Sequence, residues 1–170
     1  LPQLFQAVEI DGEPYWDGGY TGNPALYPLI YETTGIDILL VRLTPLQRLD
    51  NPTRSIDIID RLSEITFNAS LVSEMRAIAF VKRLIDEHKL DRGQYKRLHM
   101  HMVADDGGMG AFNASSKFNT DWAFLQELHR LGHQAADQWL KAHRHQVGAE
   151  SSFDIHETFL QQIASPPTQT

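Results

Sequence analysis

One apolar segment, "IDILLVRLTP" at residues 36–45, constrains the fold more than any other part of the sequence. It is rich in branched apolar side chains and is closed by Pro45. A short, nearly continuous apolar run of this kind is typical of a buried strand in a parallel sheet. Such strands are covered by helices, so the segment favours the α/β class.

The rest of the chain alternates strand-like and helix-like segments. A second strand is expected at 95–104, where Leu98, Met100 and Met102 fall on one side of the pleat. One predicted helix begins after the Asn23-Pro24 pair and ends near Gly35. Three others are expected at 55–66, 69–88 and 120–145, the last with a possible break at Gly132. Loops are expected at 46–54 and 105–119. This order predicts helices flanking a small mixed sheet.

The N-terminal part, "AVEIDGEPYWDGG", is typical of a β-hairpin. Two short strands flank Asp11-Gly12, a dipeptide that favours tight hairpin turns, and the second strand is expected to end at Trp16. The strand is followed directly by Asp17 and two glycines, Gly18 and Gly19.

Asp17 has two interpretations. In the first it is structural, and its carboxylate binds backbone N–H groups in a turn at Gly18-Gly19. In the second, the glycines let the backbone approach a neighbouring element, and the carboxylate accepts a proton from a nucleophile there. A solvated aspartate is a poor base at neutral pH. The second interpretation therefore expects partial burial against Tyr15, Trp16 and Tyr20, which strengthens the base.

Two other patterns suggest binding sites. His99 and His101 share a strand face, and His129 and His133 share a helix face, so either pair has metal-chelating spacing. Neither pair has an obvious carboxylate to complete the site, and we expect structural histidines and no metal. The segment "DDGGMG" at 105–110 lacks the pattern of a phosphate-binding loop, so a mobile connecting loop is expected there.

Composition narrows the class of function. A chain of 170 residues suits one compact domain, and a net charge of −7 argues against nucleic acid as a partner. The sequence has no cysteine, which fits a reducing compartment and makes a cytoplasmic location the expectation. It also has no apolar run long enough to span a membrane, so any membrane contact is expected to be peripheral.

Several segments together resemble a known family. The first 31 residues, "LPQLFQAVEIDGEPYWDGGYTGNPALYPLIY", resemble the C-terminal half of bacterial patatin-like phospholipases. The resemblance continues through "LVRLTP", "SEITFNASLVSEMRAIAFV" and "SSKFNTDWAFLQELHRLG", so it covers most of the chain. The D-G-G element gains specificity from its flanks. Many relatives carry Asn-x-Pro after the glycines, whereas here Asn23 directly precedes Pro24, which leaves the subfamily open.

The resemblance implies a three-layer α/β/α fold and a Ser–Asp dyad that hydrolyses lipid esters without a cofactor. The dyad aspartate corresponds to Asp17, with Gly18 and Gly19 as its motif companions. Asp17 would take the proton of the serine, which attacks the ester carbonyl and forms an acyl-enzyme. In the family, the serine lies in a G-x-S-x-G turn, and an upstream glycine-rich loop forms the oxyanion hole.

This chain contains no G-x-S-x-G segment. The resemblance therefore implies that the serine lies in an N-terminal portion of the same protein, and that this chain alone is inactive. We expect residues 1–162 to be the C-terminal portion of one patatin-like domain and residues 163–170 to be a frayed tail. The alternative hypothesis is a non-catalytic binding module that kept the α/β scaffold.

Overall fold

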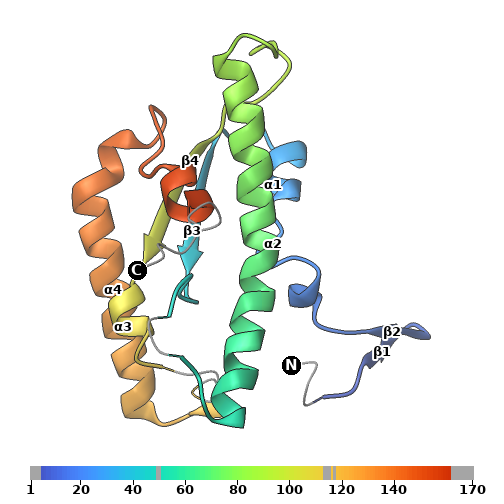
Figure 1. Ribbon diagram of the computed structural model, residues 1–170, viewed down its shortest axis with the longest axis vertical. Coiled ribbons are helices and arrows are strands. Elements are labelled where there is room, and N and C mark those ends of the chain that lie inside the picture. The colour runs from blue at the N-terminus through green and yellow to red at the C-terminus, as the bar shows by residue number, and fades with distance from the viewer. Residues whose placement is uncertain (1–4, 49–50, 113–115, 117, 162–170) are drawn as a thin grey trace, which may run out of the picture.

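The computed structural model describes residues 5–48, 51–112, 116 and 118–161. The expected tail at 163–170 lies outside these residues. Along the chain the regular elements are β1 (Val8–Ile10), β2 (Glu13–Tyr15), a 3-10 turn η1 (Gly18–Tyr20), α1 (Tyr27–Glu32), β3 (Asp37–Arg42), α2 (Ser55–Asp86), β4 (His99–Ala104), α3 (Asp106–Met109), α4 (Trp122–His143), a 3-10 turn η3 (Arg144–Gln146) and a π turn η4 (His156–Leu160) (Figure 1).

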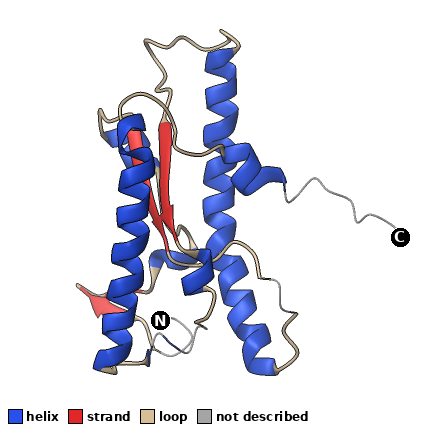
Figure 2. Cartoon of the chain, turned by 90° about the vertical axis from the view of Figure 1, so that its left-hand side faces the viewer, coloured by secondary structure: helices blue, strands red, loops and turns tan. Residues whose placement is uncertain are grey.

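The central sheet consists of β3 and β4, which pair in parallel from Asp37↔His99 to Arg42↔Ala104. Helix α2 lies over one face of this sheet and α4 over the other (Figures 1 and 2). Parallel strands cannot be joined by a tight turn, and here the long α2 makes the crossover. The expected α/β class is thereby confirmed.

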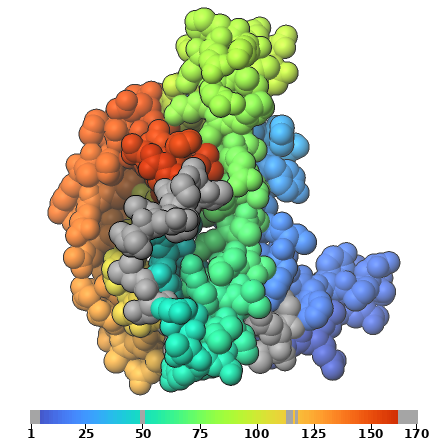
Figure 3. Space-filling model, viewed as in Figure 1, coloured from blue at the N-terminus to red at the C-terminus, as the bar shows by residue number. Residues whose placement is uncertain are grey.

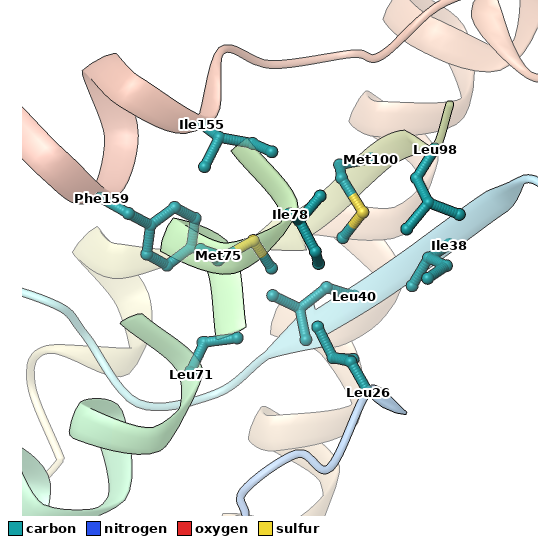
Figure 4. Packing of buried hydrophobic residues seen from close by; sticks show 10 residues of the cluster. All are labelled: Leu26, Ile38, Leu40, Leu71, Met75, Ile78, Leu98, Met100, Ile155 and Phe159. Atoms are coloured by element: carbon teal, nitrogen blue, oxygen red, sulfur yellow. The ribbon is translucent and has the colours of Figure 1, made fainter. Parts of the chain in front are cut away.

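The hydrophobic core lies between the sheet and α2. Leu40 from β3 and Met100 from β4 meet Met75 from α2, and Met75 and Met100 are completely buried (Figure 4). Leu98 is also buried and Met102 packs against the same cluster, so the predicted apolar side of β4 is confirmed. The strand itself is shorter than the expected 95–104, because pairing with β3 begins only at His99.

The two helices predicted at 55–66 and 69–88 form the single helix α2 of 32 residues. The polar residues between them do not interrupt it. Thr66 donates its hydroxyl hydrogen to the carbonyl of Leu62 within the helix, and the Asn68 amide reaches out to the carbonyl of Pro45. Their side chains therefore leave the backbone hydrogen bonds of the helix intact, and the predicted separation was wrong.

The predicted start of the first helix at Asn23-Pro24 was also wrong, because α1 begins at Tyr27. Its cap residue, Leu26, has no capping side chain of its own. Instead the Leu26 N–H donates to the carboxylate of Glu74 on α2, at 3.0 and 3.2 Å. A residue 48 positions away thus supplies the acceptor that a local cap normally provides.

In the C-terminal half of the chain, the structure differs from two further expectations. The glycine-rich segment at 105–110 contains the one-turn helix α3, capped by Asp105, whose carboxylate accepts the Gly108 N–H at 2.8 Å. It is therefore ordered rather than a plain mobile loop. Helix α4 continues through Gly132 without a break.

The sheet leaves apolar surface uncovered along β3. Leu39 and Val41 are 51% and 63% exposed, so β3 is buried on one face rather than on both. The outer edge of β4 is partly blocked, because Met100 exchanges hydrogen bonds with Ser151 and Ser152. The outer edge of β3 pairs with no other strand in the described part of the chain.

Candidate functional site

The β1–β2 hairpin delivers Asp17 to its position. The strands pair from Val8↔Tyr15 to Ile10↔Glu13, so the predicted hairpin is confirmed, and β2 ends at Tyr15, one residue before the expected Trp16. Asp11 and Gly12 both have positive φ, 53° and 83°, which a two-residue hairpin turn requires. The hairpin projects from the body of the protein (Figure 1).

Asp17 caps the 3-10 turn η1. Its Oδ1 accepts the Gly19 N–H at 2.8 Å, which fixes the orientation of the carboxylate. No hydrogen bond to its Oδ2 is present among the described residues, so this oxygen is open to a further donor. The turn expected from the structural interpretation is therefore present, and the carboxylate retains an acceptor for an external proton.

The two glycines have different roles. A Cβ at Gly19 would lie 2.9 Å from Cε1 of Phe67 on α2, closer than real Cβ atoms approach, and 3.0 Å from Oδ1 of Asp17, which is tighter than most real contacts. A Cβ at Gly18 would have no neighbour within 4 Å. Of the two glycines, Gly19 therefore lets the backbone approach α2. This close approach is what the interpretation of Asp17 as a proton acceptor expects.

Helix α2 holds the segment that follows Asp17. The ring of Tyr20 packs on that of Phe67 with centroids 5.4 Å apart. The Asn23 N–H donates to Oγ of Ser70 at 3.0 Å, and Glu74 holds the Leu26 N–H as described above. Phe67, Ser70 and Glu74 are three and four residues apart, so they lie on one face of the helix.

The environment of Asp17 differs from the expectation. Asp17 is exposed, and Tyr15 and Trp16 are 55% and 62% exposed, so the predicted partial burial is absent in this chain. The reason is geometric, since the hairpin projects outward and only the turn at Gly19 packs on α2. The structure thus provides an oriented, accessible carboxylate without an apolar shell around it.

No described serine is arranged as its nucleophile. Ser70, which holds the segment after the D-G-G element, uses its hydroxyl to accept from Asn23 and to donate to the carbonyl of Phe67 at 3.3 Å. Its hydroxyl is therefore engaged in positioning the backbone.

The pair His99 and His101 belongs to a buried polar network that the sequence did not predict. Oδ1 of Asp37 lies 2.9 Å from Nε2 of His101 and 3.4 Å from Nδ1 of His99, and it accepts the Gly148 N–H at 2.9 Å. Burial raises the pKa of Asp37, but the hydrogen bonds from His101 and Gly148 outweigh burial and hold the pKa below its ordinary value. Trp139 packs edge-on against His101 at 5.8 Å.

This network has the character of a structural anchor. It ties the start of the sheet to the segment after α4, and no group of three potential metal ligands occurs in the described part of the chain. His129 and His133 lie on an exposed face of α4, with ring centroids 6.2 Å apart. The sequence contained no signal for Asp37, because its proximity to both histidines follows from the parallel register.

The aspartates of the "DDGGMG" segment are also committed to structure. Asp105 caps α3, and Asp106 pairs with the buried Arg42 at 2.7 Å. Nearby, Arg48 binds the buried carboxylate of Glu64 and the carbonyls of Gly110 and Phe112. The segment is thereby fixed between β3 and α2.

None of the helices in the described ranges is long and apolar enough to cross a membrane. Comparison of the chain with protein-family models, with curated proteins and with solved structures found no match.

Proposed function

We propose that this chain supplies the general base of a serine lipid acyl hydrolase, with Asp17 as the base and the serine on a separate N-terminal portion. The observation that carries the proposal is the geometry of the D-G-G turn. Asp17 is oriented by the Gly19 N–H, one of its oxygens is open, and Gly19 permits a contact with Phe67 that a larger residue would prevent. A general base needs this combination of fixed orientation and access.

The proposed reaction follows from these groups. Asp17 accepts the proton of the serine hydroxyl as the serine oxygen attacks the ester carbonyl, and it passes this proton to the departing alcohol oxygen as the acyl-enzyme forms. Water then attacks the acyl-enzyme and gives a proton to Asp17, which returns it to the serine oxygen as the free fatty acid is released. The oxyanion hole belongs to the serine-bearing portion.

The uncovered apolar surface supports a companion portion. Parallel sheets normally extend beyond two strands, yet here β3 has an open edge in the described part of the chain. Several apolar residues near the start of α2 are also at least half exposed: Ile56, Ile58, Ile59, Leu62 and Ile65. Surface of this kind marks an interaction site. A companion that extends the sheet would give the three-layer α/β/α architecture of the patatin-like family.

The test uses this chain together with the serine-bearing portion. We expect Asp17→Asn to lower ester hydrolysis by about 10²–10⁴-fold, the usual contribution of a general base. Asp11→Asn is the matched control, because it makes the same chemical change at the exposed turn of the same hairpin. Near-normal turnover by the Asp17→Asn variant would remove Asp17 from the mechanism.

The same exposed surface favours one alternative function, a non-catalytic interaction module. A fluorophosphonate probe that reacts with activated serines separates the two. Labelling of a serine in the companion portion supports the hydrolase, and binding of a companion without any labelling supports the module. A cytoplasmic location belongs to the proposal and is supported by the absence of cysteine.

A further inference from the structure

A wide hollow lies between the C-terminal half of α2 and η4, two elements that pack side by side (Figure 3). Its volume is about 870 Å³, which lies within the range of small-molecule sites. Helix α2 contributes three cations to its wall, Arg76, Lys82 and Arg83. We call the cavity bounded by these cations and by the apolar side chains of Phe80 and Ile155 the cationic hollow.

The three cations are available to a ligand. Their side chains form no hydrogen bond or ion pair with any residue that the structure describes. Arg83 is held over the ring of Phe80, with 5.4 Å between its guanidinium carbon and the ring centroid. This cation–π contact places a guanidinium directly beside an apolar surface. The N–H donors of all three side chains therefore remain open to an acceptor.

The acidic residues in the wall of the hollow are already engaged. Asp86 accepts two hydrogen bonds from Arg97, at 2.7 and 3.2 Å, and Glu87 pairs with Lys89 at 2.6 Å. Asp154 accepts an N–H of η4 at 2.8 Å. The cations of the hollow thus have no carboxylate partner among the described residues, although the chain has a net charge of −7. This local excess of positive charge favours an anion.

The rest of the wall is largely apolar. Ala79 and Phe80 of α2 contribute to it, as do Ile155 and Leu160 from the C-terminal segment. Ile155 is buried, whereas Phe80 is 51% exposed, so the Phe80 ring is accessible from the hollow. A ligand that uses the whole hollow therefore combines an anionic group with an apolar body.

The cationic hollow is separate from the D-G-G turn. Phe67 and Ser70, which hold the turn and the segment after it, do not line the hollow. At 1.5 Å per residue, Arg76 and Arg83 lie about 14 and 24 Å along α2 from Phe67. Binding in the hollow therefore requires neither Asp17 nor a serine.

We propose that the cationic hollow binds a soluble phosphate monoester whose organic part is apolar. The phosphate contacts Arg76, Lys82 and Arg83, and the organic part lies on Phe80. A phosphate monoester carries about two negative charges and three acceptor oxygens, which suit two planar guanidinium groups and one ammonium group. This inference goes beyond the proposed function and does not depend on it.

Isothermal titration calorimetry of this chain with phenyl phosphate tests the inference, at low ionic strength, where exposed charges are screened least. Inorganic phosphate carries the charge alone and phenol the ring alone, so we expect both to bind more weakly than phenyl phosphate. Arg83→Gln should weaken the binding of phenyl phosphate about tenfold, because it removes a charged hydrogen-bond donor. Phe80→Ala should weaken the binding of phenyl phosphate but not that of inorganic phosphate.

The matched control is Arg144→Gln, the same change at an exposed arginine of η3 that does not line the hollow. It should leave the affinity for phenyl phosphate unchanged, and so should Asp17→Asn. Unchanged affinity in Arg83→Gln would overturn the inference, as would equal affinities for inorganic phosphate and phenyl phosphate. Binding to vesicles that contain phosphatidic acid, without binding of phenyl phosphate, would also overturn it, because the hollow would then recognise a membrane surface.

Discussion

Gly18 and Gly19 are neighbours in the sequence, but their surroundings differ. Because a Cβ at Gly19 would meet Phe67 and Asp17 while one at Gly18 would meet nothing, we expect Gly19→Ala to be destabilising and Gly18→Ala to be nearly neutral. Overpacking of this kind typically costs about 1–3 kcal/mol. Chemical denaturation of the two variants measures the difference. Equal free energies of unfolding would show that the turn does not depend on contact with α2.

At the same scale, Asp37 predicts a pH dependence of stability. Its pKa is lower in the folded protein than in the unfolded chain. The unfolded chain therefore binds more protons in the acidic range, and stability rises with pH there. The contribution of Asp37 is complete above the unfolded value of about 3.9 and is lost as the pH falls through the folded pKa.

The substitution Asp37→Asn tests this. It should cost about 1–3 kcal/mol at neutral pH, because charged hydrogen bonds to His101 and Gly148 are replaced by weaker ones. It should also flatten the acid limb of the stability curve. Urea denaturation from pH 3 to pH 7 measures both effects, with Asp11→Asn as the exposed control. If the Asp37→Asn variant lost stability at acid pH as the unchanged protein does, Asp37 would not be the cause of that loss.

At the scale of elements, Glu64 connects α2 to two segments that follow the strands. Its carboxylate binds Arg48 at 2.6 Å and Arg61 at 3.1 Å, and Arg48 in turn holds the carbonyls of Gly110 and Phe112. We expect Glu64→Gln to destabilise the fold by about 2 kcal/mol or more, since it removes the charge of a buried carboxylate that two arginines share.

Glu127→Gln is the matched comparison, because Glu127 pairs with Arg130 at 2.7 Å on the exposed surface of α4. Exposed pairs of this kind contribute little to stability, because water screens their charges. Thermal unfolding of both variants provides the test. A loss for Glu64→Gln as small as that for Glu127→Gln would mean that Glu64 does not hold these segments.

The same elements explain what the sequence could and could not predict. The apolar run at 36–45 predicted β3, and Asp11-Gly12 predicted the hairpin, because both signals are local. The start of α1 was missed because its cap comes from Glu74 on another helix. Helix α2 was divided in two because the polar residues near Asn68 suggested a boundary, whereas their side chains bind elsewhere. The order and spacing of the elements could be predicted because they depend on local sequence. The ends of α1 and α2 could not, because they depend on contacts with distant residues.

The same difference between local signals and tertiary contacts applies to the candidate site. Asp17 and its turn were predictable from the D-G-G pattern. Its exposure was not, because the direction in which the hairpin projects depends on how Gly19 packs on Phe67. The network at Asp37 was hidden for a related reason, since only the parallel register places it opposite His99.

At the scale of the whole molecule, the uncovered apolar surface predicts association. With Leu62 and Ile58 at least half exposed, and the edge of β3 open, we expect the chain alone to self-associate and to bind an apolar dye. Replacing both residues with lysine should reduce both effects while changing the free energy of unfolding by less than about 0.5 kcal/mol per substitution.

Light scattering after size-exclusion chromatography measures the association. The lysine variant is the internal comparison, because it alters only side chains on the exposed surface of α2. A chain that stays monomeric at high concentration and binds no dye would show that this surface needs no companion.

The most direct test of Asp17 as the base is the first turnover. This chain is combined with the serine-bearing portion and mixed rapidly with a chromogenic ester, and the initial burst of alcohol reports acylation of the serine. The account predicts a full burst for the unchanged protein and for Asp11→Asn, and a burst slowed by about 10²–10⁴-fold for Asp17→Asn. A burst of normal rate and size from Asp17→Asn would contradict it.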